Sequence, residues 1–240
     1  MKNMNGILYV VSTPIGNLED MTFRAIRVLK EVDLIAAEDT RHTGRLLQHF
    51  EIKNRLVSYH DFNKNDRTPV LIDRLSEGKS IALVSDAGTP GISDPGYVLI
   101  TQAIAHGFDV YSIPGPSAAI AALSIAGLAT DRFVFEGFLP VKKGRKTRFE
   151  FLVDEPRTII FYESPHRIIK TLTELLQYFG EREVAVCREL TKKFEETIRG
   201  PLSGVISKLE QRKPRGEFVI ILEGRRKTDE KNQSERGTDT

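Results

Sequence analysis

The chain has 240 residues, of which 40% are hydrophobic and 28% charged, the composition of an ordinary globular protein and not of a disordered one. Its formal net charge of +2 neither requires nor excludes a nucleic-acid partner, and its single cysteine, Cys187, excludes an internal disulfide and is expected to be a small buried thiol. The first apolar stretch, Ile7–Val11, is too short for a signal sequence or a membrane span, which predicts a cytoplasmic protein that does not contact a membrane.

In the first half of the chain, short apolar runs alternate with segments of helical spacing. Strands are predicted at residues 8–11, 34–37, 56–59, 81–84 and 110–113, with a helix in each interval. This alternation is typical of stacked strand-helix units. It predicts an α/β domain over residues 1–115 with a mainly parallel sheet and helices on both faces.

The pattern changes after an alanine-rich helix predicted at residues 117–126. Strands are then predicted at 133–138, 158–161, 184–188, 195–198 and 218–222, with a helix at 165–179. Strands now outnumber helices, which predicts a second α/β domain over 116–224 with a mixed sheet and flanking helices. Residues 225–240 contain no aliphatic or aromatic side chain, apart from the methyl groups of threonine, and are predicted to be a disordered polar tail.

Three loops are expected at the carboxyl ends of the first strands, where open α/β sheets bind ligands: residues 12–18, 85–96 and 114–117. The central loop is rich in glycine and proline, which fix the backbone and let a ligand approach the main chain. It has neither a P-loop nor a dinucleotide-binding glycine pattern. Asp86 and Asp94 therefore indicate a ligand with hydroxyl groups or a cation, although Asp94 alone is better explained as the cap of the next helix.

Four motifs in this order carry a family resemblance: Thr13–Leu18, Ala37–Arg41, Ser85–Gly96 and Phe161–Arg167. Together they resemble the 16S ribosomal RNA cytidine-2′-O-methyltransferase family of the tetrapyrrole-methylase-like superfamily, over about residues 6–224. The resemblance implies a two-domain homodimer that binds S-adenosylmethionine in the cleft between its domains. It also implies that the substrate is a ribose in the decoding centre of 16S ribosomal RNA, within the small ribosomal subunit.

Carried over to this chain, the resemblance assigns cofactor contacts to both halves. The implied contacts are Pro14, Asp86, Ala87, Gly88, Pro116, Ser117, Ala118, Tyr162 and Leu190. The family pattern also brings 188–192 and 216–218 to the cleft, although a surface ion pair explains Arg188 and Glu189 nearly as well. Instead of contacting the cofactor, Tyr162 can be an aromatic core residue at the end of a strand. Ser117 can be a helix N-cap, a role that is compatible with a cofactor contact.

For the RNA, we single out residues 140–148, called the basic segment below, which hold five Lys or Arg and no acid. Such a run suits a phosphate backbone, although many charge runs are only solvated faces. The predicted RNA contacts are Lys142, Lys143, Arg145 and Lys146 in this segment, with Arg41, His42 and Arg167 from other loops.

Methylation of a ribose hydroxyl is helped by a base, and three residues of suitable type are Glu163, His166 and Lys192. Each also has an ordinary role, as an ion pair, a residue at a helix start or a surface lysine. No Cys, His and Asp cluster has metal-ligand spacing, so no metal is expected. Two other functions stay open: a methyltransferase of this fold that acts on a tetrapyrrole precursor or a protein side chain, and a non-catalytic RNA-binding module.

Overall fold

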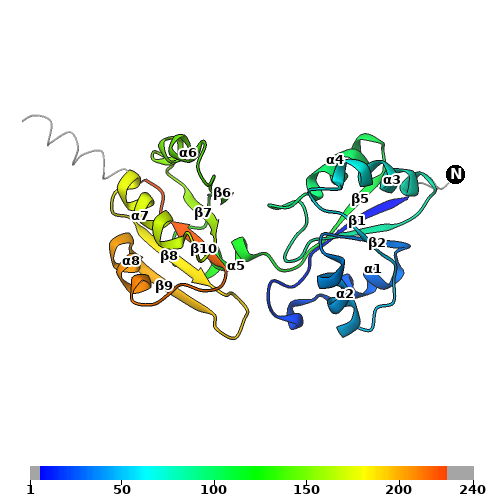
Figure 1. Ribbon diagram of the computed structural model, residues 1–240, viewed down its shortest axis with the longest axis horizontal. Helices are drawn as coiled ribbons and strands as arrows, with labels where there is room; N and C mark the ends of the chain where they lie inside the picture. Colours follow the sequence, from blue (N-terminus) through cyan, green and yellow to red (C-terminus); the bar gives the residue numbers. More distant parts are fainter. Residues whose placement is uncertain (1–5, 226–240) are drawn as a thin grey trace, which may run out of the picture. The chain divides into compact units, whose positions relative to one another are not determined.

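The structure, a computed structural model, describes residues 6–225 and divides into two compact units (Figure 1). The first unit ends at Ser117 and the second begins at Ala118, whereas the sequence pattern predicts this boundary between residues 115 and 116. Apart from Arg225, the predicted polar tail lies outside the described residues. No helix within 6–225 is both long and apolar enough to cross a membrane.

The first unit contains the predicted parallel sheet. Its strands are β1 (Ile7–Val11), β2 (Leu34–Ala37), β3 (Leu56–Ser58), β4 (Ile81–Val84) and β5 (Asp109–Ile113), in the spatial order β3-β2-β4-β1-β5. Every neighbouring pair is parallel. All five carboxyl ends therefore lie at the same edge of the sheet.

Helices cover both faces of this sheet, as predicted. They are α1 (Phe23–Glu31), α2 (Thr40–His49), α3 (Lys64–Ser76) and α4 (Gly96–Ala105), and a short 3-10 helix, η1, spans Leu18–Asp20. Alternate side chains of a strand point to opposite faces, so Ile35 and Ala37 of β2 pack with α1 and α2, while Leu34 and Ala36 pack with α3 and α4. Figure 1 shows the two helix pairs on opposite sides of the strands.

The second unit contains the predicted mixed sheet. Its strands are β6 (Phe133–Phe138), β7 (Thr158–Glu163), β8 (Glu183–Arg188), β9 (Glu196–Pro201) and β10 (Phe218–Leu222), in the order β6-β7-β10-β8-β9. The β6–β7 pair is parallel and the other three are antiparallel. Phe218 lies opposite both Glu163 and Arg188, so the end of β7, the end of β8 and the start of β10 share one edge.

The helices of this unit are α5 (Ala118–Ile125), α6 (Arg145–Leu152), α7 (Ile168–Phe179) and α8 (Leu202–Glu210). Residues of α6, α7 and α8 form one apolar core with the sheet, and α5 contacts β7 and β10. Helix α8 was not predicted, and α6 begins within the basic segment.

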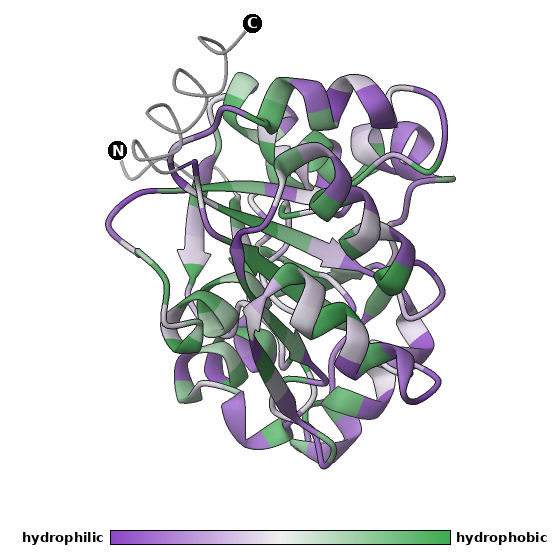
Figure 2. Ribbon diagram, turned by 90° about the vertical axis from the view of Figure 1, so that its left-hand side faces the viewer, coloured by the Kyte–Doolittle hydropathy of each residue, from purple (hydrophilic) through white to green (hydrophobic). Residues whose placement is uncertain are grey.

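The middle parts of the strands are coloured as hydrophobic in Figure 2, and many loops as hydrophilic. Cys187 is buried on β8, as expected.

Candidate functional site

The order of the strands in the first sheet creates a switch point at its carboxyl edge. Strands β1 and β4 are neighbours, but β1 leads to α1 on one face and β4 leads to α4 on the other. Loops that leave neighbouring strands toward opposite faces mark the place where open α/β sheets bind ligands. We call the loops 12–17, 38–39, 85–95 and 114–117 the switch edge.

Backbone hydrogen bonds join the two loops that diverge from this point. The Thr13 amide donates to the Gly88 carbonyl at 2.9 Å, and the Gly88 amide donates to the Thr13 carbonyl at 3.1 Å. The hydroxyls of Ser12 and Thr89 lie 2.8 Å apart, and the Thr13 hydroxyl donates to the Ser85 carbonyl at 3.1 Å. Gly88 has a φ of 80°, a conformation that side chains with a Cβ rarely adopt.

The loop after β5 is held against the same point. The Ser12 amide donates to the Ile113 carbonyl at 3.2 Å, and a Cβ built on Gly115 would lie only 2.9 Å from the Ser12 Cβ. The Thr89 hydroxyl donates to the Pro116 carbonyl at 3.5 Å. The structure thus brings Pro14, the 86–88 segment and Pro116 together at the switch edge.

Asp94 closes the central loop on itself. One carboxylate oxygen accepts the amides of Gly91 and Gly96, both at 2.8 Å. Pro95 is the N-cap residue of α4, so Asp94 is not the N-cap. The Asp94 carboxylate nevertheless accepts the amide of Gly96, the first residue of the helix. Gly91 and Ser93 have φ values of 87° and 67°. The central loop therefore has a fixed shape.

The switch edge gathers negative charge. The Asp86 carboxylate accepts the Asp39 amide at 3.0 Å, and the Asp86 amide donates to the Glu38 carboxylate at 3.3 Å. Burial raises the pKa of Glu38, and the neighbouring carboxylates Asp86, Asp94 and Asp61 raise it further, against a lowering by the Asp86 amide. This electrostatic environment favours a bound positive charge.

The residues around Arg41 form the start of α2. Asp39 is the N-cap, and its carboxylate accepts the amides of Arg41 and His42. The Arg41 guanidinium pairs with the same carboxylate at 3.0 Å and, with the Arg41 amide, lowers the pKa of Asp39 to about 2. The Arg41 side chain remains 88% exposed, so it stays accessible to a substrate.

In the second unit, two of the three predicted base candidates are engaged in ion pairs. Glu163 is buried, pairs with Arg167 at 2.7 Å and accepts the Thr171 hydroxyl at 2.7 Å. Lys192 contacts Glu189 and Glu217 at 3.0 and 2.9 Å; burial opposes its charge, but these two carboxylates outweigh that effect and raise its pKa. The two carboxylates beside Lys192 favour its charged ammonium form.

His166 differs from these two candidates. It follows the carboxyl end of β7, its side chain is exposed, and within residues 6–225 it has no hydrogen-bond or ion-pair partner. Tyr162, at the end of the same strand, is partly buried beside the rings of Phe135 and Phe138, and burial raises its pKa. Leu190 is buried in the loop after β8, Ala118 begins α5, and Ser117 directly precedes it.

The basic segment is not uniformly exposed. Lys142 and Lys143 lie in an exposed turn, and Lys146 is exposed on α6, 3.6 Å from Glu150. Arg145 instead is buried: its guanidinium contacts Glu174 at 2.6 Å and Thr171 at 2.7 Å, and donates to the Pro140 carbonyl. The structure therefore corrects the expectation that Arg145 contacts RNA, because this side chain has a structural role.

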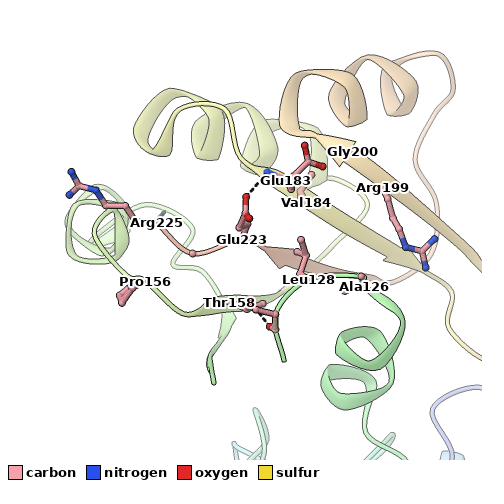
Figure 3. A pocket seen from close by; sticks show the side chains of 13 residues that line it. Ala126, Leu128, Pro156, Thr158, Glu183, Val184, Arg199, Gly200, Glu223 and Arg225 are labelled. Atoms are coloured by element: carbon pink, nitrogen blue, oxygen red, sulfur yellow. Dashed lines mark hydrogen bonds between the residues drawn. The ribbon is translucent and has the colours of Figure 1, made fainter. Parts of the chain in front are cut away.

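A pocket at the other edge of the second sheet contains none of the predicted site residues. It lies where β7 and β8 begin and β9 and β10 end, as Figure 3 shows. Its polar side chains are engaged locally: Arg199 donates to the Ile125 carbonyl at 2.5 and 3.1 Å, and Thr158 to the Ala129 carbonyl at 2.6 Å. Within the described part of the chain, no cluster of His, Cys, Asp and Glu could hold a metal ion.

Comparisons with known proteins agree with this architecture. The protein-family model of the tetrapyrrole (corrin/porphyrin) methylases matches residues 7–206 of the chain. The structure of a cobalt precorrin-4 methyltransferase superposes with a TM-score of 0.67 at 18% identity, over 91% of this chain and 94% of that chain. A uroporphyrin-III C-methyltransferase from Thermus thermophilus, in complex with S-adenosyl homocysteine, gives a TM-score of 0.62 at 19% identity, over 90% and 96%. The matched family model covers most of the chain and therefore places it in the family of the tetrapyrrole methylases.

Two curated relatives narrow this class. Both are named ribosomal RNA small subunit methyltransferase I. The one from a Synechocystis strain is 53% identical over 96% of this chain and 83% of its own length, and the one from Halalkalibacterium halodurans is 54% identical over 91% and 76%. The chain therefore belongs to the ribosomal RNA small subunit methyltransferase I family within the tetrapyrrole methylases, which confirms the resemblance seen in the sequence.

Proposed function

We propose that the chain uses S-adenosylmethionine to methylate the ribose 2′-oxygen of a cytidine in 16S ribosomal RNA, within the small subunit in the cytoplasm. The observation that carries this proposal is the identity of more than half of the aligned residues with relatives named for methylation of small-subunit ribosomal RNA. Membership of this family also argues against a non-catalytic RNA-binding module. We further propose that the chain acts as a homodimer.

The switch edge fits this cofactor by its charge and its shape. S-adenosylmethionine carries a sulfonium and an ammonium group, and Glu38, Asp86 and Asp94 offer carboxylates to cations and to ribose hydroxyls. Gly88, held by Thr13 at a positive φ, lets a ligand approach the backbone. We propose that Pro14, Asp86–Gly88, Pro116 and Ser117 hold the cofactor. The predicted contacts from the second unit, Ala118, Tyr162 and Leu190, remain part of this proposal.

Positioning contributes most of the rate in such a reaction. When bound, S-adenosylmethionine supplies an activated methyl group whose carbon–sulfur bond breaks as the ribose oxygen bonds to the methyl carbon. We propose that His166 accepts the hydroxyl proton, because its imidazole is exposed and unpaired among the described residues. Lys192 and Glu163 hold loops and helices in place by their ion pairs.

The RNA is proposed to contact Lys142, Lys143 and Lys146 of the basic segment, with Arg41, His42 and Arg167 from other loops. Arg167 is a weaker member of this set, because its guanidinium already contacts Glu163 and the Leu139 carbonyl. Because the three lysines are exposed, they can contact phosphates without any rearrangement of the fold.

A methylation assay with labelled S-adenosylmethionine tests the proposal. Its three substrates are small subunits that lack the modification, free 16S ribosomal RNA, and tetrapyrrole precursors. We expect label in the RNA. Label in a tetrapyrrole or in a ribosomal protein would instead assign the chain to another reaction of the same fold.

A further inference from the structure

Two loops of the second unit are joined at the edge where β8 ends and β10 begins. We call residues 189–195 and 211–217 the paired loops. The Glu189 amide donates to the Glu217 carbonyl at 2.9 Å, and the Glu217 amide donates to a Glu189 carboxylate oxygen at 3.0 Å. The Arg188 guanidinium donates to the Arg215 carbonyl at 2.7 Å. These contacts fix each loop to the other.

The backbone of the paired loops is held in unusual conformations. Glu189 and Thr191 have φ values of 51° and 67°, although neither is glycine. Gly216 has a φ of 89°, and a Cβ there would lie 2.4 Å from the Glu189 side chain. Lys192 fastens the arrangement by contacting the carboxylates of Glu189 and Glu217. Such conformations persist only where several contacts enforce them, so the paired loops form a rigid element.

This rigid element presents an aromatic ring and positive charge to solvent. Phe194 is 64% exposed, and the Lys193 ammonium lies 5.8 Å from its ring centroid. Within the described residues, no carboxylate lies within salt-bridge distance of Lys193, Lys213 or Arg215.

Each acid of the paired loops, and the neighbouring Glu196, has a hydrogen-bond or ion-pair partner. Glu189 and Glu217 bind Lys192, Glu195 accepts the Thr191 amide, and Glu196 at the start of β9 binds Arg188 and Arg212. The paired loops together hold five basic and three acidic side chains, so their net charge is +2. An exposed ring among unpaired cations is the combination with which proteins bind unpaired nucleotides.

We propose that the paired loops bind a single-stranded segment of the substrate RNA, with Phe194 stacked on an unpaired base and Lys193, Lys213 and Arg215 at the flanking phosphates. A base inside a duplex presents no free face to a ring, so this surface selects unpaired RNA. The inference rests on the proposed function and adds the form of RNA that is recognised. It also adds a surface outside the basic segment.

Phe194→Leu tests the stacking, because leucine keeps an apolar side chain but has no aromatic face. Binding of a short single-stranded RNA and of the duplex of the same sequence is measured by fluorescence anisotropy. We expect the variant to bind the single strand at least about fivefold more weakly, and the duplex unchanged. Phe194→Tyr should bind as the wild type does. Melting temperatures confirm that each variant is folded.

Phe151→Leu is the matched control. Phe151 is 72% exposed in the same unit, and the Arg148 guanidinium lies 5.1 Å from its ring, but this cation is paired with Glu136. We expect no loss of affinity from this variant. A loss with Phe151→Leu and none with Phe194→Leu would overturn the inference and place the unpaired base beside the basic segment.

A second variant, with Lys193, Lys213 and Arg215 all replaced by glutamine, tests the phosphate contacts. The slope of log affinity against log salt for single-stranded RNA should fall by about 2, since each lost contact removes about 0.7. An unchanged slope contradicts the inference.

Methylation of small subunits by the wild type, measured in parallel, separates the two proposals. If the wild type methylates the subunits and Phe194→Leu binds RNA normally, only the further inference is wrong. If the wild type neither methylates nor binds RNA, the proposed function fails, and the inference fails with it.

Discussion

Replacing Gly88 by valine tests whether the switch edge binds the cofactor. At a φ of 80°, a residue with a Cβ is destabilised by about 1–2 kcal/mol. A Cβ would have ordinary contacts of 3.6 Å with Ile15 and 3.7 Å with the Pro116 carbonyl, so the strain lies in the backbone. The loop can relieve this backbone strain only if it moves and loses the two hydrogen bonds between residue 88 and Thr13, each worth about 0.5–1.5 kcal/mol. These energies are similar, so the loop shifts while the unit stays folded.

We therefore expect Gly88→Val to lower the free energy of unfolding by about 1–2 kcal/mol, and to weaken cofactor binding both by opening the loop and by placing a side chain where the ligand would meet the Gly88 backbone. Only the loop that keeps its hydrogen bonds to Thr13 is expected to bind the cofactor. The affinity for S-adenosylmethionine should therefore fall about tenfold for each 1.4 kcal/mol by which the loop without these bonds is favoured. Titration calorimetry with S-adenosylmethionine measures this affinity, and denaturant unfolding measures the stability.

Gly107 provides a control with the same backbone penalty. Its φ is 77°, a Cβ there would meet nothing within 4 Å, and it lies between α4 and β5 at the amino edge of the sheet. Gly107→Val should lose similar stability and keep its cofactor affinity. If both variants bind S-adenosylmethionine equally well, the switch edge is not the cofactor site.

Three further results are expected. Replacing the three exposed lysines of the basic segment by glutamine should lower the slope of log RNA affinity against log salt by about 2–3 and leave the melting temperature unchanged. Arg145→Gln should leave this slope unchanged and should lower the free energy of unfolding by about 3 kcal/mol, because it breaks a buried ion pair. Cofactor affinity should rise with pH through the raised pKa of Glu38, because the ionised carboxylate attracts the positively charged cofactor. Glu38→Gln should remove this pH dependence, whereas Glu77→Gln at the other edge of the sheet should not. His166→Gln should lower kcat about 100-fold at unchanged cofactor affinity, and an unchanged kcat would exclude it as the base.

The central strands β2 and β4 of the first sheet were predictable because they are buried on both faces. Runs such as Leu34–Ala37 and Ile81–Val84 are continuously apolar, which distinguishes them from the amphipathic helices between them. Helix α8 was missed, although Leu202, Val205, Ile206 and Leu209 have helical spacing and are buried. Gly204 within this segment and Pro201 before it obscured the pattern.

The loops of the switch edge were predictable from their glycines, but their mutual contacts were not. The bond pair between Thr13 and Gly88 exists because β4 inserts between β1 and β2, and this insertion depends on packing between distant segments. The carboxylate cluster at Glu38 depends on the same insertion.

Arg145 shows why a charge run misleads. In the sequence it looks like its lysine neighbours, but Arg145, Phe149 and Leu152 share the buried face of α6, whereas Lys146 lies on the exposed face. The spacing of Phe149 and Leu152 was the available signal. The partner Glu174 is on α7 and could not be assigned from the sequence.

The central claim is tested most directly by locating the methyl group on the RNA. Small subunits that lack the modification are incubated with the chain and labelled S-adenosylmethionine, and the recovered 16S ribosomal RNA is hydrolysed with alkali. A 2′-O-methyl group blocks cleavage at its own nucleotide, so we predict label in an alkali-resistant dinucleotide that begins with cytidine. Label in a mononucleotide, which would mean methylation of a base, or label only in protein, would contradict the account.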